Sequence, residues 1–148
     1  PNPPKDNRTF KTKNALANFF CHDISCVSSS DKFMMMTIRS HDQYNTTIYG
    51  LDDRYRGIRN GRRVVLMNRE DLVENDIKEG DLVDLSSDRE SESVVSQSWY
   101  VVPYDIPRGN IATYFPESNV LIPLDSVADR SNTPTSKSVP IGIKKATN

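Results

Sequence analysis

The stretch that decides the fold runs from residue 64 to residue 83 and reads VVLMNREDLVENDIKEGDLV. Its first four residues form an apolar run that predicts a buried strand. Asn68 then caps a short helix that continues to about Asp76, with Asp71 as a box-like partner of the cap. Glu79-Gly80 predicts a turn, and residues 81–85 predict a second strand. A strand, a short helix, a turn and a strand are thus expected in close succession.

Outside this stretch, we expect strands over residues 33–38, 94–104, 120–122 and 139–143, and a helical turn over residues 108–114. Six or so short strands with two short helical turns, and neither a long helix nor a repeat, favour a closed or nearly closed barrel. The predicted fold class is therefore mainly β. A short helix between strands followed by Glu-Gly-Asp is typical of a double-psi β-barrel with a few short helices.

The barrel is predicted over residues 33–148. Residues 1–32 are polar, begin with Pro-Asn-Pro-Pro and contain Ser28-Ser29-Ser30 near their end, so we interpret them as an N-terminal tether or wrapping arm. Because the chain starts with proline, we expect a fragment of a longer protein. It shows no secretory signal, and the expected location is cytoplasmic.

The composition excludes several classes of protein. The 148 residues carry 19 Lys and Arg against 20 Asp and Glu, a formal net charge of −1, which disfavours a nucleic-acid partner. No apolar run approaches the roughly 20 residues of a membrane span. Cys21 and Cys26, with His22 between them, offer three possible zinc ligands, whereas a structural zinc site uses four. Reduced thiols are favoured over reactive thiols or a metal site, and no metal ligand is predicted.

The sequence shows no self-contained catalytic apparatus. Two histidines do not establish a nucleophile–base arrangement, and neither of the common glycine-rich phosphate motifs occurs. The arginines at positions 54, 56, 59, 62 and 63 indicate a solvated basic face, a phosphate-facing surface or a nucleic-acid contact. Asn68 and Asp71 allow two roles that can coexist: a helix cap, or recognition of guanine, whose ring N–H and exocyclic amine a carboxylate accepts together.

Three blocks occur in an order that carries a resemblance. They read TIRSHDQYNTT over residues 37–47, the quoted strand and helix over 64–72 continuing through 77–83, and YFPESNVL over 114–121 followed by PTSK over 134–137. Together they resemble the C-terminal dinucleotide-binding domain of the molybdopterin oxidoreductases, which include formate dehydrogenases, nitrate reductases and dimethyl sulfoxide reductases. The first two blocks are most similar to formate-dehydrogenase-like alpha subunits.

The resemblance implies a double-psi β-barrel that closes over a bis(molybdopterin guanine dinucleotide) cofactor carrying molybdenum or tungsten. By the family's pattern, Asn68 and Asp71 read a guanine. Pyrophosphate and pterin contacts are expected from the loop after the first strand and from two later positions: Arg39, Ser40, His41, Gln43, Asn45, Thr46, Asn119 and Lys137. Such amides, hydroxyls and cations suit a ligand rich in donors and acceptors.

Two departures and one absence qualify the resemblance. Arg69 stands where the family commonly has proline, and Asn45 replaces a common histidine. The metal ligand and any iron–sulfur cluster belong to other domains of such enzymes, so no catalytic residue is assigned and the isolated chain is expected to be inactive. Its expected partners are the remaining domains of its parent, an oxidoreductase resembling formate dehydrogenase. A free-standing small subunit and a non-catalytic double-psi barrel that binds proteins are the alternatives, although polar strand-end loops favour an anionic ligand.

Overall fold

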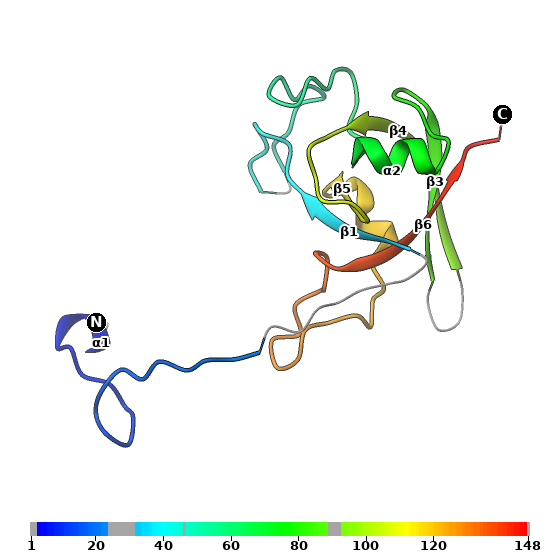
Figure 1. Cartoon of the computed structure of the whole chain (residues 1–148). Coiled ribbons are helices and arrows are strands. Elements are labelled where there is room, and N and C mark those ends of the chain that lie inside the picture. The colour runs from blue at the N-terminus through cyan, green and yellow to red at the C-terminus, as the bar shows by residue number, and fades with distance from the viewer. Residues whose placement is uncertain (1–2, 24–31, 46, 89–92, 148) are drawn as a thin grey trace.

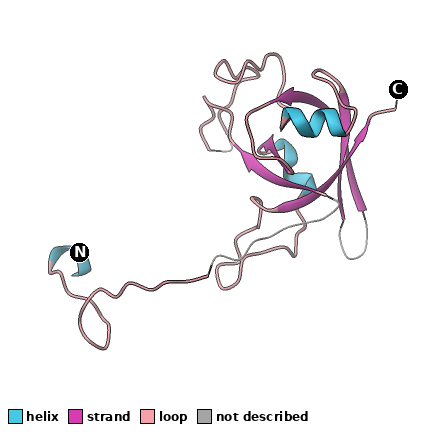
Figure 2. Cartoon of the chain, viewed as in Figure 1, coloured by secondary structure: helices cyan, strands magenta, loops and turns pink. Residues whose placement is uncertain are grey.

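A closed barrel of six strands dominates the computed structural model, which describes residues 3–23, 32–45, 47–88 and 93–147 (Figure 1). The strands are β1 (Phe33–Ile38), β2 (Val64–Met67), β3 (Leu82–Asp88), β4 (Ser93–Pro103), β5 (Asn110–Tyr114) and β6 (Val139–Lys145). The helices of the described residues are two short α-helices, α1 (Pro3–Asp6) and α2 (Arg69–Glu74), and one 3-10 helix, η1 (Glu117–Leu121) (Figure 2).

The strand order around the barrel is β1-β5-β2-β4-β3-β6. Two pairs are parallel, β1 with β5 and β2 with β4, and the other four contacts are antiparallel. In the sequence, β3 lies between β2 and β4, and three strands lie between β1 and β5. The predicted mainly β fold, a double-psi β-barrel with few short helices, is confirmed.

The core follows from the apolar runs of the sequence. All four residues of β2 are buried, and Met35, Trp99 and Ile111 add large side chains with no exposed surface. A smaller apolar cluster around Ile58, which includes Tyr114, forms a second group. Burial of a large apolar side chain contributes roughly 1.5–3 kcal/mol, so these positions hold the barrel closed.

The stretch from residue 64 to residue 83 folds largely as predicted. The side chain of Asn68 accepts the Glu70 N–H at 2.8 Å and caps α2. Gly80 takes a φ of +86° in the turn that leads into β3. The box-like role of Asp71 is wrong, because its two carboxylate oxygens instead accept from Arg108 and Gly109, on the segment before β5.

Two expected elements are corrected. Residues 108–114 do not form a helical turn: Gly109 takes a φ of +73°, and β5 begins one residue later. A strand forms there because both of its edges find partners, β1 on one side and β2 on the other. The apolar run over residues 120–122 is not a strand. It enters η1 and buries Leu121 against the core, while Val120 remains 49% exposed.

The N-terminal segment has its own character. Residues 5–23 are exposed throughout, and Phe19 and Phe20 retain 99% and 74% of their accessible surface. The role of residues 1–32 as an arm stays a prediction. Cys21 is an exposed free thiol, and Cys26 lies outside the described residues. Within the described ranges no helix is long and apolar enough to cross a membrane.

Candidate functional site

The long segment between β1 and β2, residues 39–63, is fixed by a buried carboxylate. Asp53 is 1% exposed and accepts the Tyr114 hydroxyl at 2.7 Å, an Arg56 guanidinium N–H at 2.6 Å and the His41 backbone N–H at 3.0 Å. Burial raises the pKa of the Asp53 carboxyl, but these hydrogen bonds outweigh burial and lower it to about 2. Burial, and then the hydrogen bond to Asp53, raise the pKa of the Tyr114 hydroxyl. These contacts tie His41, Asp53 and Arg56 of this segment to Tyr114 of β5.

A buried guanidinium forms a second anchor. Arg62 is 4% exposed and donates to Glu117 at 2.6 Å, to the Ser40 hydroxyl at 2.6 Å and to the Gln43 side-chain oxygen at 2.8 Å. The Gln43 amide donates in turn to the Asn45 and Phe115 carbonyl oxygens, at 2.7 Å and 2.9 Å. Ser40 and Gln43, two predicted cofactor contacts, therefore shape the loop through protein–protein hydrogen bonds.

Three other predicted residues of this loop remain accessible. Arg39, His41 and Asn45 are exposed. Arg39 donates to the Asn45 side-chain oxygen at 3.0 Å, and the His41 ring lies against Tyr55 with the ring centroids 3.6 Å apart. Thr46 lies outside the described residues. The accessible guanidinium and amide are available to an external ligand.

Asn119 and Lys137 join the same end of the barrel. Asn119 lines a cavity of about 340 Å³ together with Phe115, Pro134 and Ser136. The Lys137 ammonium donates to the Thr37 carbonyl oxygen near the end of β1. We call this cluster the Phe115 end: Arg39–Asn45, Arg62, Phe115, Glu117, Asn119 and Lys137.

Asn68 and Asp71 lie at the other end, here called the Gly109 end: Asn68, Asp71, Arg108 and Gly109. Asp71 is 4% exposed and accepts the Gly109 N–H at 2.7 Å and the Arg108 Nε–H at 3.1 Å. Asn68 adds a 2.7 Å hydrogen bond to the Ile106 carbonyl oxygen. Recognition of guanine by this pair stays a prediction. Each carboxylate oxygen retains a second lone pair, but little of the Asp71 surface is reachable.

The strand directions explain the separation. β1 runs parallel to β5, so Ile38 ends beside Tyr114, whereas β2 runs antiparallel to β5, so Met67 ends beside Ile111. The residues that follow the two strands leave the barrel in opposite directions. The three residue steps of β5 from Ile111 to Tyr114 separate the two strand ends by about 10 Å at the usual rise of a strand.

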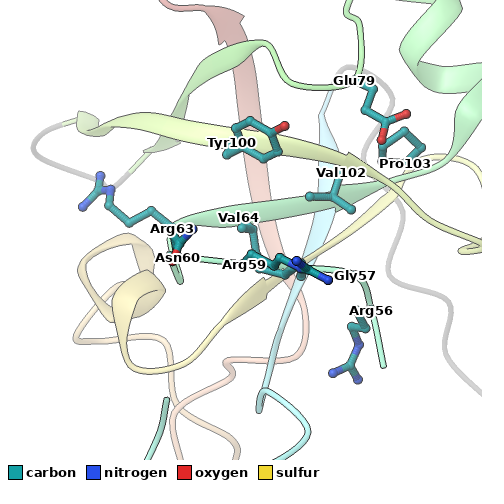
Figure 3. A pocket seen from close by; sticks show the side chains of 12 residues that line it. Arg56, Gly57, Arg59, Asn60, Arg63, Val64, Glu79, Tyr100, Val102 and Pro103 are labelled. Atoms are coloured by element: carbon teal, nitrogen blue, oxygen red, sulfur yellow. The ribbon is translucent and has the colours of Figure 1, made fainter. Parts of the chain in front are cut away.

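A pocket on the outside of β2 and β4 was not expected from the sequence. This pocket measures about 480 Å³ and adjoins the loop of residues 56–61. Figure 3 shows Tyr100, Glu79 and Pro103 on one side of Val64 and Val102, with Arg59 and Gly57 on the other. The arginine run was the only sequence signal for it, because the pairing of β2 with β4 brings the opposite wall into place.

Comparison with known families identifies the barrel. The family model described as "Molydopterin dinucleotide binding domain" matches residues 33–140. The chain belongs to this family. The matched range covers both ends of the barrel and the pocket on β2 and β4, so all the sites described above lie in the dinucleotide-binding domain, except the arm and its cysteines.

Two curated relatives extend the similarity to the N-terminal segment. An "uncharacterized oxidoreductase" of Mycobacterium tuberculosis (strain ATCC 25618 / H37Rv) is 44% identical over 150 aligned positions, covering 97% of this chain and 19% of that protein. "Protein YdeP" of Escherichia coli (strain K12) is 39% identical over 145, covering 93% and 19%. The chain thus spans about a fifth of the length of the relatives it matches.

One solved structure supports the fold. "Acetylene Hydratase from Pelobacter acetylenicus" superposes with a TM-score of 0.56 at 9% sequence identity, over 78% of this chain and 18% of that one. At that identity the likeness concerns the fold alone.

Within the described ranges of the dinucleotide-binding domain, no group of three or more His, Cys, Asp and Glu side chains could hold a metal ion.

Proposed function

We propose that this domain binds a bis(molybdopterin guanine dinucleotide) cofactor in a molybdenum or tungsten oxidoreductase resembling formate dehydrogenase. The observation that carries the proposal is the Phe115 end, where three separate segments of chain bring accessible donors and acceptors together. Arg39 and Asn45 come from the segment after β1, Asn119 from η1, and Lys137 from the segment before β6. A pterin and a pyrophosphate require this mixture of amides and cations.

The residues present fit such a group. The Phe115 end offers a cavity of about 340 Å³ beside Asn119, within the usual size range of small-molecule sites. Arg62 and Asp53 hold the surrounding loop through buried hydrogen bonds, so the binding groups are ordered before a ligand arrives. When bound, the metal centre supplies two-electron redox chemistry. This chain binds and orients the cofactor through Arg39, Asn45, Asn119 and Lys137.

The partners we propose are the remaining domains of the same polypeptide. The loop between β1 and β2 exposes five large apolar or aromatic side chains, each at least 40% accessible: Tyr44, Ile48, Tyr49, Leu51 and Tyr55. Rigidly anchored apolar side chains in solvent favour a covering surface. In the Mycobacterium tuberculosis relative, about four-fifths of the length lies outside the segment that matches this chain. A protein of that length has further domains that can cover these side chains. A protein-binding module would use the same side chains without a cofactor.

The test is elemental analysis of the full-length protein that contains this domain, purified from cells that make the cofactor. Stoichiometric molybdenum or tungsten, with pterin fluorescence after oxidation, is the expected result. Arg39→Ala should reduce cofactor retention about tenfold, the effect of one charge-assisted hydrogen bond. Arg130→Ala, at a side chain that is 93% exposed, is the matched control. Metal-free, pterin-free protein would favour the protein-binding module.

A further inference from the structure

The N-terminal arm contains a turn that is held together by its own residues. The Ala15 N–H donates to the Thr12 carbonyl oxygen at 3.1 Å, and Ala15 takes a φ of +56°. The Thr12 hydroxyl donates to the Leu16 carbonyl oxygen at 2.7 Å, and the Asn14 side-chain oxygen accepts the Leu16 N–H at 3.1 Å. Because all of these contacts join residues 12–16 to one another, the turn keeps its shape without support from the barrel.

Large apolar side chains around this turn lie in solvent. The exposed fractions are 63% for Leu16, 99% for Phe19 and 74% for Phe20. Their neighbours give no cover, since every residue from 5 to 23 is exposed, and in Figure 1 this part of the chain (blue) lies away from the barrel. Two adjacent exposed phenylalanines beside an ordered turn indicate a surface that another part of a larger protein covers.

The arm is also basic, whereas the chain as a whole is close to neutral. Residues 5–13 contain four cations and one carboxylate, all of them exposed: Lys5, Asp6, Arg8, Lys11 and Lys13. The formal net charge of this stretch is thus +3, against −1 for the 148 residues together. Complementary charge on a partner guides such a segment to its place and fixes its register. The surface that fits the arm is therefore apolar where it meets the phenylalanines and acidic where it meets residues 5–13.

The comparison with the Mycobacterium tuberculosis relative indicates where such a surface lies. The family model begins at residue 33, so the arm is outside the matched dinucleotide-binding domain. The alignment with the relative nevertheless covers 97% of this chain, so it includes most of the arm. About four-fifths of the relative lies outside the aligned segment. The arm and the barrel thus occur together in a much longer protein, whose other domains offer a partner surface within the same polypeptide.

We propose that residues 10–20 dock into an apolar groove with an acidic rim on another domain of the same polypeptide. Leu16, Phe19 and Phe20 fill the groove, while Lys11 and Lys13 meet carboxylates on its rim. Because the turn is formed beforehand, docking loses little conformational entropy, and because both surfaces belong to one chain, a weak contact is sufficient. This inference rests on the part of the proposed function that makes the remaining domains the partners of this chain. It does not depend on the cofactor.

The test is limited proteolysis by trypsin, with mass spectrometry to follow cleavage after Lys11 and Lys13. In the isolated 148-residue chain both sites are exposed and should be cut quickly. In the full-length protein that contains this domain, cleavage there should be about tenfold slower, because a docked segment does not enter the protease. Phe19→Ser combined with Phe20→Ser should return the rate to within about twofold of the isolated chain. Phe19→Leu combined with Phe20→Leu keeps apolar side chains and should retain most of the protection.

Val73→Ser, at an apolar side chain of α2 that is 81% exposed, is the matched control and should leave the protection unchanged. Equal cleavage of the full-length protein and the isolated chain would overturn the inference, as would protection that survives both serines.

Protection of the isolated chain would also overturn it, in favour of a second copy if the protection rises with concentration and of the barrel itself if it does not. Metal and pterin are measured on the same full-length sample. Cofactor in a protein whose arm is cut quickly would refute only the docking, and a protected arm without cofactor would refute only cofactor binding.

Discussion

The two ends of the barrel use similar residues to different effect. At the Gly109 end, the polar side chains of Asn68 and Asp71 form hydrogen bonds within the protein that join α2 to the segment before β5. At the Phe115 end, buried Ser40 and Gln43 also form hydrogen bonds within the protein, but Arg39 and Asn45 remain exposed. The difference teaches that a site needs two groups of polar residues, one that fixes the backbone and one that stays available.

The largest effect should come from Arg62, which fixes the Phe115 end. Arg62→Ala leaves Glu117 and the Ser40 hydroxyl without their buried partner, and loss of one member of a buried ion pair costs about 3–5 kcal/mol. Urea unfolding measures the free energy of unfolding. The control is Arg54→Ala, where the side chain is 73% exposed and the expected change is below about 0.5 kcal/mol. Equal effects would show that this end is not preorganised by Arg62.

Asp53 accepts the backbone N–H of His41, a residue of the Phe115 end, and gives the stability of that end a pH dependence. Its folded pKa of about 2 lies below its ordinary value of 3.8, so its stabilisation is present above pH 4 and is lost as the pH falls towards 2. The shift corresponds to about 2 kcal/mol. Unfolding of the wild type and Asp53→Asn at pH 7, 4 and 2.5 should show a difference that shrinks with acidity. A difference independent of pH would contradict the lowered pKa.

At the Gly109 end, Asp71→Asn tests whether the carboxylate is only structural. Loss of a charged acceptor for Arg108 and Gly109 should cost about 1–3 kcal/mol of stability. Cofactor retention by the full-length protein, read from pterin fluorescence after oxidation, should remain unchanged. Urea unfolding measures the stability separately. Stability near that of the wild type with lost cofactor retention would show that Asp71 contacts the cofactor.

The smallest effect should come from Asn68→Ala. Removing the cap of α2 costs about 0.5–2 kcal/mol, with a further contribution from the lost hydrogen bond to Ile106. Thermal unfolding followed by circular dichroism measures this change. Asn68→Ser retains a capping oxygen and should recover part of the loss. If serine recovers nothing, the contact with Ile106 rather than the cap is the stabilising interaction.

Local patterns were sufficient for much of the fold. Apolar runs predicted β1 and β2, and the residues from Asn68 to Gly80 predicted the helix cap and the turn. The strand β5 was missed because its five residues owe their conformation to neighbours on both sides. The run over residues 120–122 was misassigned because so short an apolar segment has no distinguishing period.

The candidate site could be predicted only in part, because it is formed by tertiary contacts between residues far apart in the sequence. The sequence could identify the polar loop of residues 39–45 and the arginine run, but not which side chains would be buried. Arg62 meets Ser40 from 22 positions away, and Glu79 faces the loop of Arg59 only after β2 and β4 pair. Contacts between residues this far apart in the sequence leave no periodic signal in a single sequence.

The pairing of β1 has a consequence for synthesis of the chain. β1 ends at Ile38, yet its two neighbours begin at Asn110 and Val139. At about 5–20 residues per second, the first strand leaves the ribosome several seconds before the last one exists. A chain that stops before residue 139 would leave the edges of β1 and β3 open to pairing with other chains. The last strand of the barrel therefore protects the first strand of the barrel.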